Sequence, residues 1–167
     1  NTNFFGVMRV CRSIIPMMRK EGKGLIINIS SVAGFIPIPF QSMYSASKYA
    51  LEAMSEALRM ELKPFGIKVV IVEPGDTSTG FTDNRAFVKG ATKQSIYYEK
   101  FSKSVNTMIK DERNGPGPEM VVKAIVKVID KNNPPIRVTV GMSYKLIAII
   151  KRIIPDRLLH YILAKLY

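Results

Sequence analysis

The sequence has few of the residues that build disulfides, metal sites or membrane spans. Its 167 residues include one cysteine, one histidine and no tryptophan. The single cysteine, Cys11, cannot form an internal disulfide, which favours a reducing compartment, and we expect a cytoplasmic protein. His160 has no second ligand at a metal-binding spacing, so we predict no metal site. No apolar run reaches the roughly 18 to 20 residues that span a bilayer.

Acidic residues are also scarce compared with basic ones. The chain has 25 Lys and Arg against 13 Asp and Glu, giving a net charge of +12. Such a surface can attract nucleic acid, anionic lipid or an anionic small molecule. The cations are scattered, however, and occur only in pairs such as Arg19-Lys20 and Lys151-Arg152. No nucleic-acid-binding motif accompanies them, so we expect no nucleic-acid partner, whereas a lipid surface remains open beside an ordinary solvated one.

Apolar spacing in the first half predicts alternating helices and strands. We expect a helix over residues 4–20, a buried strand over 25–31, a helix over 42–65 and a second buried strand over 67–72. Apolar residues at successive positions are typical of parallel strands covered on both faces. A strand, a helix and a strand at this length form a right-handed βαβ unit, so the predicted class is α/β with a parallel sheet.

The second half begins with a long segment of weak periodicity. Residues 76–118 contain one expected helix, near 95–110, and such an excursion is typical of a lid over a binding site. A helix over 121–129 and a strand over 136–140 follow, and residues 143–167 form a C-terminal helical extension of two short helices. Three strands are few for a parallel sheet, and we expect its outer faces to lie bare.

One stretch gathers side chains suited to proton transfer. The strand over 25–31 ends in Ser30 and Ser31, and the next helix opens with Tyr44-Ser45-Ala46-Ser47-Lys48. Residues four apart share a helical face, so Tyr44 and Lys48 point into the same space. Adjacent serines on a strand point to opposite faces, and periodicity alone does not choose between them. Tyr-x-x-x-Lys by itself is also common in helices without any catalytic role.

The combination resembles the short-chain dehydrogenase/reductase family. Ser31 precedes Tyr44 by 13 positions, as the family's catalytic serine does, and Asn3-Phe4-Phe5-Gly6 resembles its Asn-x-x-Gly motif. The resemblance implies a Rossmann-like, doubly wound parallel sheet with helices on both faces. It further implies that residues 1–167 are the C-terminal part of one such domain. The implied catalytic residues are Ser31, Tyr44, Lys48 and Asn3.

The resemblance also implies a nicotinamide cofactor, NAD or NADP. Its implied binding residues are Tyr44, Lys48, Pro74, Gly75, Thr77 and Thr79, the last four from a segment similar to the family's Pro-Gly-x-x-x-Thr. The family's glycine-rich phosphate loop and its ribose-selecting residue have no counterpart in these 167 residues, which leaves the choice between NAD and NADP open. We therefore expect the chain to belong to a longer dehydrogenase.

The implied chemistry is hydride transfer with a tyrosine as acid and base. A free tyrosine, with a pKa near 10, is a poor base at neutral pH. We expect the Lys48 ammonium and the nicotinamide ring to lower the pKa of Tyr44. Ser31 would stabilise the charge that develops on the substrate oxygen. By resemblance, Asn3 would hold a water that links Lys48 to solvent.

Apolar residues surround this predicted site and suggest a lipophilic alcohol or ketone of the steroid, retinoid or fatty-chain type. We expect Ser31, Phe35, Phe40 and Met43 to bind the substrate. Other candidates for its apolar wall, which can equally belong to the core, are Ile36, Ile38, Phe81, Phe87, Tyr97 and Tyr98.

Three alternatives remain at the level of sequence. The apolar and basic residues of 143–167 suit packing over a substrate entrance, and they also suit contact with a membrane surface. A catalytically silent nucleotide-sensing or scaffold protein could keep the same fold, and a basic peripheral membrane protein is a third function. By resemblance we expect a homodimer or tetramer formed through the helices over 4–20 and 42–65.

Overall fold

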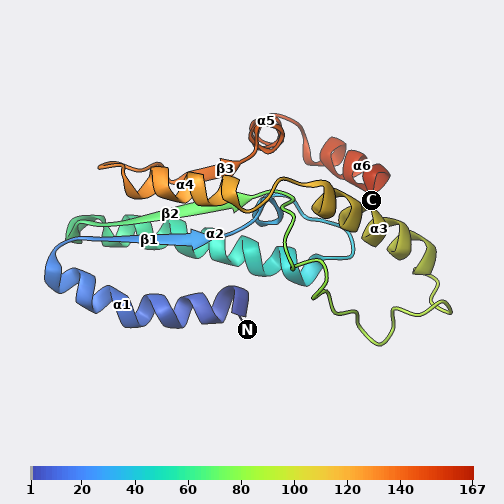
Figure 1. The fold of residues 1–167 in the computed structure, drawn as a ribbon, viewed down its shortest axis with the longest axis horizontal. Coiled ribbons are helices and arrows are strands. Elements are labelled where there is room, and N and C mark those ends of the chain that lie inside the picture. Colours follow the sequence, from blue (N-terminus) through green and yellow to red (C-terminus); the bar gives the residue numbers. More distant parts are fainter. Residues whose placement is uncertain (1) are drawn as a thin grey trace.

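The computed structural model describes residues 2–167 and shows a three-stranded parallel sheet flanked by helices (Figure 1). The chain forms a π-helical turn, Thr2–Gly6, followed by α1 (Val7–Glu21), β1 (Gly24–Ile29), a 3-10 turn at Val32–Gly34, α2 (Ser42–Leu62), a 3-10 turn at Lys63–Phe65 and β2 (Ile67–Pro74). The second half forms α3 (Tyr98–Asn114), α4 (Glu119–Ile129), β3 (Arg137–Val140), α5 (Met142–Lys151) and α6 (Asp156–Leu166). The α/β class with parallel strands is confirmed.

The sheet has the strand order β1-β2-β3, with every pair parallel. Gly24 pairs with Ile67 at the start of β1 and β2, and Ile29 pairs with Val72 near their ends. In Figure 1, α1 lies on one side of the strands, and α4, α5 and α6 lie along the other. The carboxyl ends of β1 and β2 therefore meet at one edge, which α3, α5 and α6 approach.

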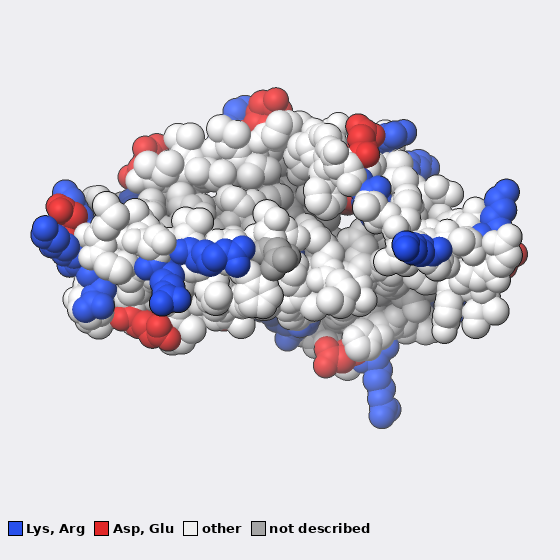
Figure 2. Space-filling view, turned by 90° about the horizontal axis from the view of Figure 1, so that it is seen from below, with Lys and Arg blue, Asp and Glu red and all other residues white. Residues whose placement is uncertain are grey.

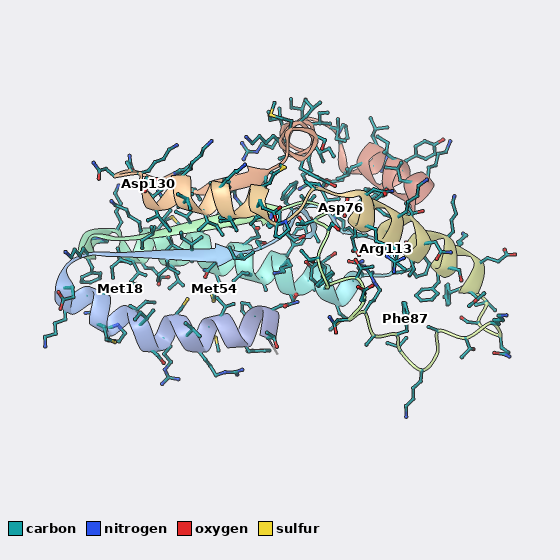
Figure 3. The ribbon with its side chains drawn as sticks, viewed as in Figure 1. Met18, Met54, Asp76, Phe87, Arg113 and Asp130 are labelled. Atoms are coloured by element: carbon teal, nitrogen blue, oxygen red, sulfur yellow. The ribbon has the colours of Figure 1, made fainter. Side chains whose placement is uncertain are left out.

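The core is centred on β2, whose residues from Val69 to Val72 are at most 1 % exposed. On the α1 side, Cys11 packs with Ile26 and Leu62. Met18 lies between α1 and the sheet, where a side chain at Gly24 would collide with it (Figure 3). A second cluster joins Ile36, just after β1, to α6 through the residues Leu159 and Leu163. The C-terminal extension is thus packed onto the loop that follows β1.

Several predicted boundaries shift in the structure. The first helix begins with the π-helical turn and continues through Pro16 to Glu21, where Gly22 ends it with a φ of 65°. The first strand stops at Ile29, because Ser31 instead caps the 3-10 turn. The lid helix runs from Tyr98 to Asn114 rather than over 95–110. The remaining helices and strands, including the two short helices of the tail, lie where the periodicity predicted them.

Candidate active site

The two serines after β1 have different surroundings. Ser31 has extended backbone angles, and its hydroxyl accepts a hydrogen bond from the Ala33 N–H at 3.1 Å. Its side chain also lies close enough to the Tyr44 phenol to lower the pKa of that phenol. Ser30 is 4 % exposed, and its Oγ has no hydrogen-bond partner within residues 2–167. The structure therefore brings Ser31, and not Ser30, to Tyr44.

Glycine is required at position 34 to hold this strand end close to α2. A Cβ there would lie 2.6 Å from the Ser30 Oγ and 2.8 Å from the Glu52 Oε1. The start of α2 is fixed in turn by Ser45, which is buried and accepts a hydrogen bond from the Ile38 N–H at 3.3 Å. These close approaches set the position of Ser31 relative to the face of α2.

Tyr44 and Lys48 lie one turn apart on α2, as the spacing predicted. The Lys48 Nζ is 5.8 Å from the centre of the Tyr44 ring and donates a hydrogen bond to the Ile29 carbonyl at 2.9 Å. Lys48 is 9 % exposed, and burial lowers its pKa. An ammonium has three N–H donors, so two remain besides the bond to the end of β1.

The pKa of Tyr44 is raised, chiefly by burial. The Ser31 side chain lowers it, while the charges of Glu112 and Arg85 raise and lower it respectively. In the chain without a cofactor the pKa of Tyr44 is not lowered, because the loss of hydration disfavours the phenolate and the Lys48 ammonium is directed to the Ile29 carbonyl. The lowering by Lys48 together with a bound nicotinamide stays a prediction. Tyr44 is consequently held as a neutral phenol at neutral pH.

The Pro74-Gly75 segment lies at the end of β2, beside the end of β1. A Cβ at Gly75 would lie 2.1 Å from the Cε2 of Tyr144 in α5, so this aromatic ring rests directly on the turn. The Tyr144 phenol donates a hydrogen bond to Asp76, whose pKa is raised by burial. The Thr77 hydroxyl donates to the Gly75 carbonyl at 3.0 Å.

The remaining predicted cofactor residue, Thr79, is exposed and further along the chain. Its hydroxyl accepts a hydrogen bond from the Phe81 N–H at 3.3 Å. Figure 3 shows Asp76 near α3 and the end of β2, and Phe87 out in the long loop that follows. Pro74, Gly75 and Thr77 therefore share the sheet edge with Ser31, whereas Thr79 begins the lid.

The lid is attached to α3 beside Tyr44. Arg85 and Glu112 form an ion pair at 2.6 Å, and the Thr82 hydroxyl donates to the same carboxylate at 2.6 Å. The Phe81 ring is centred 5.9 Å from the ring of Tyr44. Sequence reasoning missed Arg85 and Glu112, since nothing in a local pattern relates two residues separated by 27 positions.

The predicted apolar wall divides between the site and the core. Phe40 and Phe87 each stack edge-on against Phe101 of α3, with ring centres 5.9 and 5.6 Å apart. Ile36 is buried, and Phe35 packs against its cluster on the side of α6, so both stabilise the tail's attachment. Met43 is 83 % exposed. Ile38 and Tyr98 are half-buried and Tyr97 is exposed.

Asn3 lies in the π-helical turn before α1, which packs against α2. Its side chain is exposed. Its proposed role in a proton relay stays a prediction. No three His, Cys, Asp or Glu side chains gather as metal ligands in residues 2–167.

A parallel sheet with helices, and a Ser, Tyr and Lys at the carboxyl edge, define a Rossmann-like α/β protein of the dehydrogenase type. A sequence model described as short chain dehydrogenase matches residues 1–87. The chain therefore belongs to the short-chain dehydrogenase family of oxidoreductases.

Relatives of this chain include a reductase and a retinol dehydrogenase. It is 46 % identical over 168 residues to 3-ketodihydrosphingosine reductase of Bacteroides thetaiotaomicron, covering 100 % of this chain and 62 % of that protein. It is 32 % identical to human retinol dehydrogenase 8, covering 92 % of this chain and 51 % of that protein. The chain thus spans only part of the length of these relatives.

Solved structures support the fold. A short-chain dehydrogenase from Streptomyces avermitilis has a TM-score of 0.71 at 33 % identity, covering 90 % of this chain and 54 % of that one. One from Burkholderia cenocepacia, solved in complex with NADP, also has a TM-score of 0.71, covering 97 % of this chain and 56 % of that one. At 23 % identity, the latter supports the fold alone.

The residues at the sheet edge fit a nicotinamide nucleotide. Lys48 keeps two N–H donors for ribose hydroxyls, and Gly75 itself adds no side chain to the turn after β2, on which the Tyr144 ring rests. Thr77 adds a hydroxyl beside that turn. The donor chemistry matches the expected group, although the phosphate-binding loop of the family has no counterpart in this chain.

Proposed function

We propose that the protein containing this chain is an NAD- or NADP-dependent oxidoreductase that interconverts an alcohol and a carbonyl on a lipophilic substrate. The observation that carries the proposal is the convergence of Ser31, Tyr44 and Lys48 at the carboxyl edge of the sheet. The Pro74-Gly75 turn lies at the same edge, at the end of the neighbouring strand. This convergence does not support the alternative of a catalytically silent scaffold, because a scaffold needs no proton donor there.

In the reducing direction, the Tyr44 phenol donates its proton to the substrate oxygen. Burial raises the pKa of this phenol, which keeps it protonated and suited to the role of acid. The Ser31 hydroxyl hydrogen bonds to the same oxygen and stabilises its developing negative charge. When bound, the nicotinamide supplies or accepts the hydride. Lys48 would hold the ribose hydroxyls through its two remaining N–H donors, and together with the bound nicotinamide ring its ammonium would stabilise the phenolate that remains after proton transfer.

Two observations support a lipophilic substrate. Phe40, Phe87 and Phe101 form a chain of edge-on aromatic contacts between the loop before α2, the lid and α3. Phe81 stacks near Tyr44 itself. In addition, the relatives are named for a ketodihydrosphingosine and for retinol. We propose a long-chain or polycyclic alcohol or ketone.

We also retain a homo-oligomer as a proposal. The outer side of α1 exposes Val10 at 67 % and Met17 at 63 %, and Met60 of α2 is 71 % exposed. Figure 2, which views the molecule from the α1 side, shows uncharged surface between the Lys and Arg side chains that gather over α1. Such a surface suits a second copy of the chain. A cytoplasmic location likewise remains a proposal.

The test is turnover by the complete protein with NADPH or NADH and lipophilic ketones, followed as nucleotide absorbance. Tyr44→Phe removes the proton donor and keeps the ring, so we expect turnover to fall at least a hundredfold while nucleotide binding is retained. Tyr49→Phe is the matched control on the same helix, because Tyr49 is 38 % exposed and is not among the predicted site residues. Near-normal turnover by Tyr44→Phe would refute the mechanism, and nucleotide binding without turnover in the unmodified protein would favour the sensor.

A further inference from the structure

The C-terminal helices expose an apolar surface that the fold does not use. On α6, Leu159 and Leu163 are buried against the Ile36 cluster, at 7 % and 8 % exposure. Leu158, Ile162 and Leu166 lie beside them on the same helix and are exposed, so packing accounts for only some of its apolar residues. We define the tail surface by the exposed apolar residues of 142–166: Met142, Leu146, Ile147, Ile149, Ile150, Ile153, Leu158, Tyr161, Ile162 and Leu166.

Basic side chains accompany this tail surface. Residues 142–166 contain five Lys and Arg and a single acidic residue, Asp156, for a net charge of +4 (5 − 1). None of the five forms a salt bridge within the part of the chain that the structure describes. The five cations are Lys145, Lys151, Arg152, Arg157 and Lys165.

A groove of about 980 Å³ between α4, β3 and α5 continues the basic surface. Its two carboxylates, Glu56 and Glu73, are already paired with Arg137. Its walls also carry apolar residues of α4 and α5, such as Val128 and Ile149. Among residues 2–167, the cations along the groove that form no salt bridge are Lys123, Lys127, Lys131, Lys145, Lys151 and Arg152.

We infer that the face formed by α4, α5 and α6 docks on the surface of an anionic lipid bilayer. These helices lie along one side of the molecule, away from α1 (Figure 1), so their cations and apolar side chains can approach one plane together. Exposed apolar residues interleaved with unpaired cations match the headgroup and upper acyl region of such a bilayer. None of the helices formed by residues 2–167 has the length and apolarity to cross a membrane.

The positive charge of this face favours an anionic bilayer over a second copy of the chain as its binding partner. A copy would present the same cations to each other across a twofold axis, and like charges at short distance oppose association. Anionic headgroups neutralise them instead. The inference goes beyond the proposed oxidoreductase activity and does not depend on it, because vesicle binding requires neither nucleotide nor substrate.

The experiment is cosedimentation of the complete protein with vesicles of phosphatidylcholine, alone or mixed with phosphatidylglycerol. We expect binding to the mixed vesicles that weakens as salt is added. Loss of a cation near an anionic surface weakens binding about fivefold. The triple variant Lys145→Gln, Lys151→Gln and Arg152→Gln should therefore bind about a hundredfold more weakly.

Matched controls separate this surface from general charge and from misfolding. Arg12→Gln, Lys20→Gln and Lys23→Gln remove the same charge from exposed residues on the α1 side and should leave binding within about twofold. Ile153→Ser, at a residue 76 % exposed, should weaken binding, whereas Val88→Ser, at one 79 % exposed, should not. Unchanged far-ultraviolet circular dichroism confirms that each variant is folded.

Three results would overturn the inference. They are the same affinity for neutral and mixed vesicles, equal losses from the two triple variants, and absence of binding. A fall in oligomeric state for Ile153→Ser, measured by sedimentation velocity, would assign the face to a second copy. Tyr44→Phe must bind vesicles like the unmodified protein, so failure of the catalytic proposal and failure of this one give different results.

Discussion

Arg137 holds together three carboxylates that the fold brings close to the sheet. Its Nη1 lies 2.7 Å from the Glu73 carboxylate and also contacts Glu52, while its Nη2 lies 2.9 Å from Glu56. Glu73 and Glu52 are 2 % and 3 % exposed in their side chains, whereas Arg137 is 26 % exposed. We therefore choose Arg137→Ala as the perturbation, because it leaves two buried carboxylates without their cation.

The loss of stability follows from the burial of Glu52 and Glu73. Removing one partner of a buried ion pair costs about 3 to 5 kcal/mol, since the remaining charge stays in a poorly solvated site. For a domain of this size, each kcal/mol lowers Tm by about 2 to 4 °C. We expect Arg137→Ala to lower Tm by of order 10 °C. Arg137→Lys keeps the positive charge but loses the planar guanidinium that binds several carboxylates at once, so its Tm should fall less than that of Arg137→Ala.

The destabilisation should depend on pH with a defined sign. Burial raises the pKa of Glu73 above its usual value of 4.5, although the Thr139 hydroxyl donates to it. A carboxyl group whose folded pKa is raised binds its proton more tightly in the folded state, so stability falls as pH rises through that pKa. Without Arg137 the carboxylate loses a donor and its pKa rises further. The decrease in Tm caused by Arg137→Ala should therefore be smaller at pH 5 than at pH 8.

The assay is thermal unfolding of the complete protein at both pH values, followed by circular dichroism. Arg113→Ala is the control, because Arg113 pairs with Asp83 at 3.3 Å but both side chains are at least 67 % exposed. Exposed pairs contribute about 0 to 1 kcal/mol, so this variant should lose at most a few degrees. Equal losses from the two variants, or a deficit for Arg137→Ala that does not change with pH, would refute the reasoning.

Two further predictions concern single positions. Gly75→Ala places a Cβ 2.1 Å from the Tyr144 ring. We expect the free energy of unfolding to fall by about 1 to 3 kcal/mol and nucleotide binding, measured by calorimetry, to weaken. The double variant with Tyr144→Ala should recover stability. A double variant no more stable than Gly75→Ala would contradict the contact. Burial raises the pKa of the Cys11 thiol, so little of it is present as the reactive thiolate. Iodoacetamide should therefore label Cys11 slowly in the folded protein and rapidly in urea. Equal labelling rates would contradict the burial of Cys11.

The elements that the sequence predicted correctly are those whose signals are local. The buried strand β2 is an apolar run bounded by Gly66 and Pro74, and its position follows from residues within that run. The one-turn relation of Tyr44 to Lys48 is likewise a property of a single helix. The choice of Ser31 over Ser30 needed the family spacing, and the structure accounts for it through the close approach of Gly34 to α2.

The features that the sequence did not predict depend on contacts between distant residues. The Arg137 contacts join residues 64 and 85 positions apart, and no periodicity encodes such a meeting. One signal was nevertheless present, since Glu73 interrupts an apolar strand and a buried carboxylate requires a partner. The burial that raises the pKa of Tyr44 in the chain without its cofactor was not predicted, and the Phe81 ring of the lid, 37 positions away, contacts it.

The tail connects the two halves of the candidate site. At one end, Tyr144 of α5 rests on Gly75 and hydrogen bonds to Asp76, at the end of β2. At the other, Leu159 and Leu163 of α6 pack against the loop that follows β1 and Ser31. Both strand ends that carry the site are therefore supported by the inner side of the tail, and only its outer side remains free for lipid. If the tail docks on a bilayer, the sheet edge that holds Tyr44 is fixed relative to the membrane in which a lipophilic substrate would be dissolved.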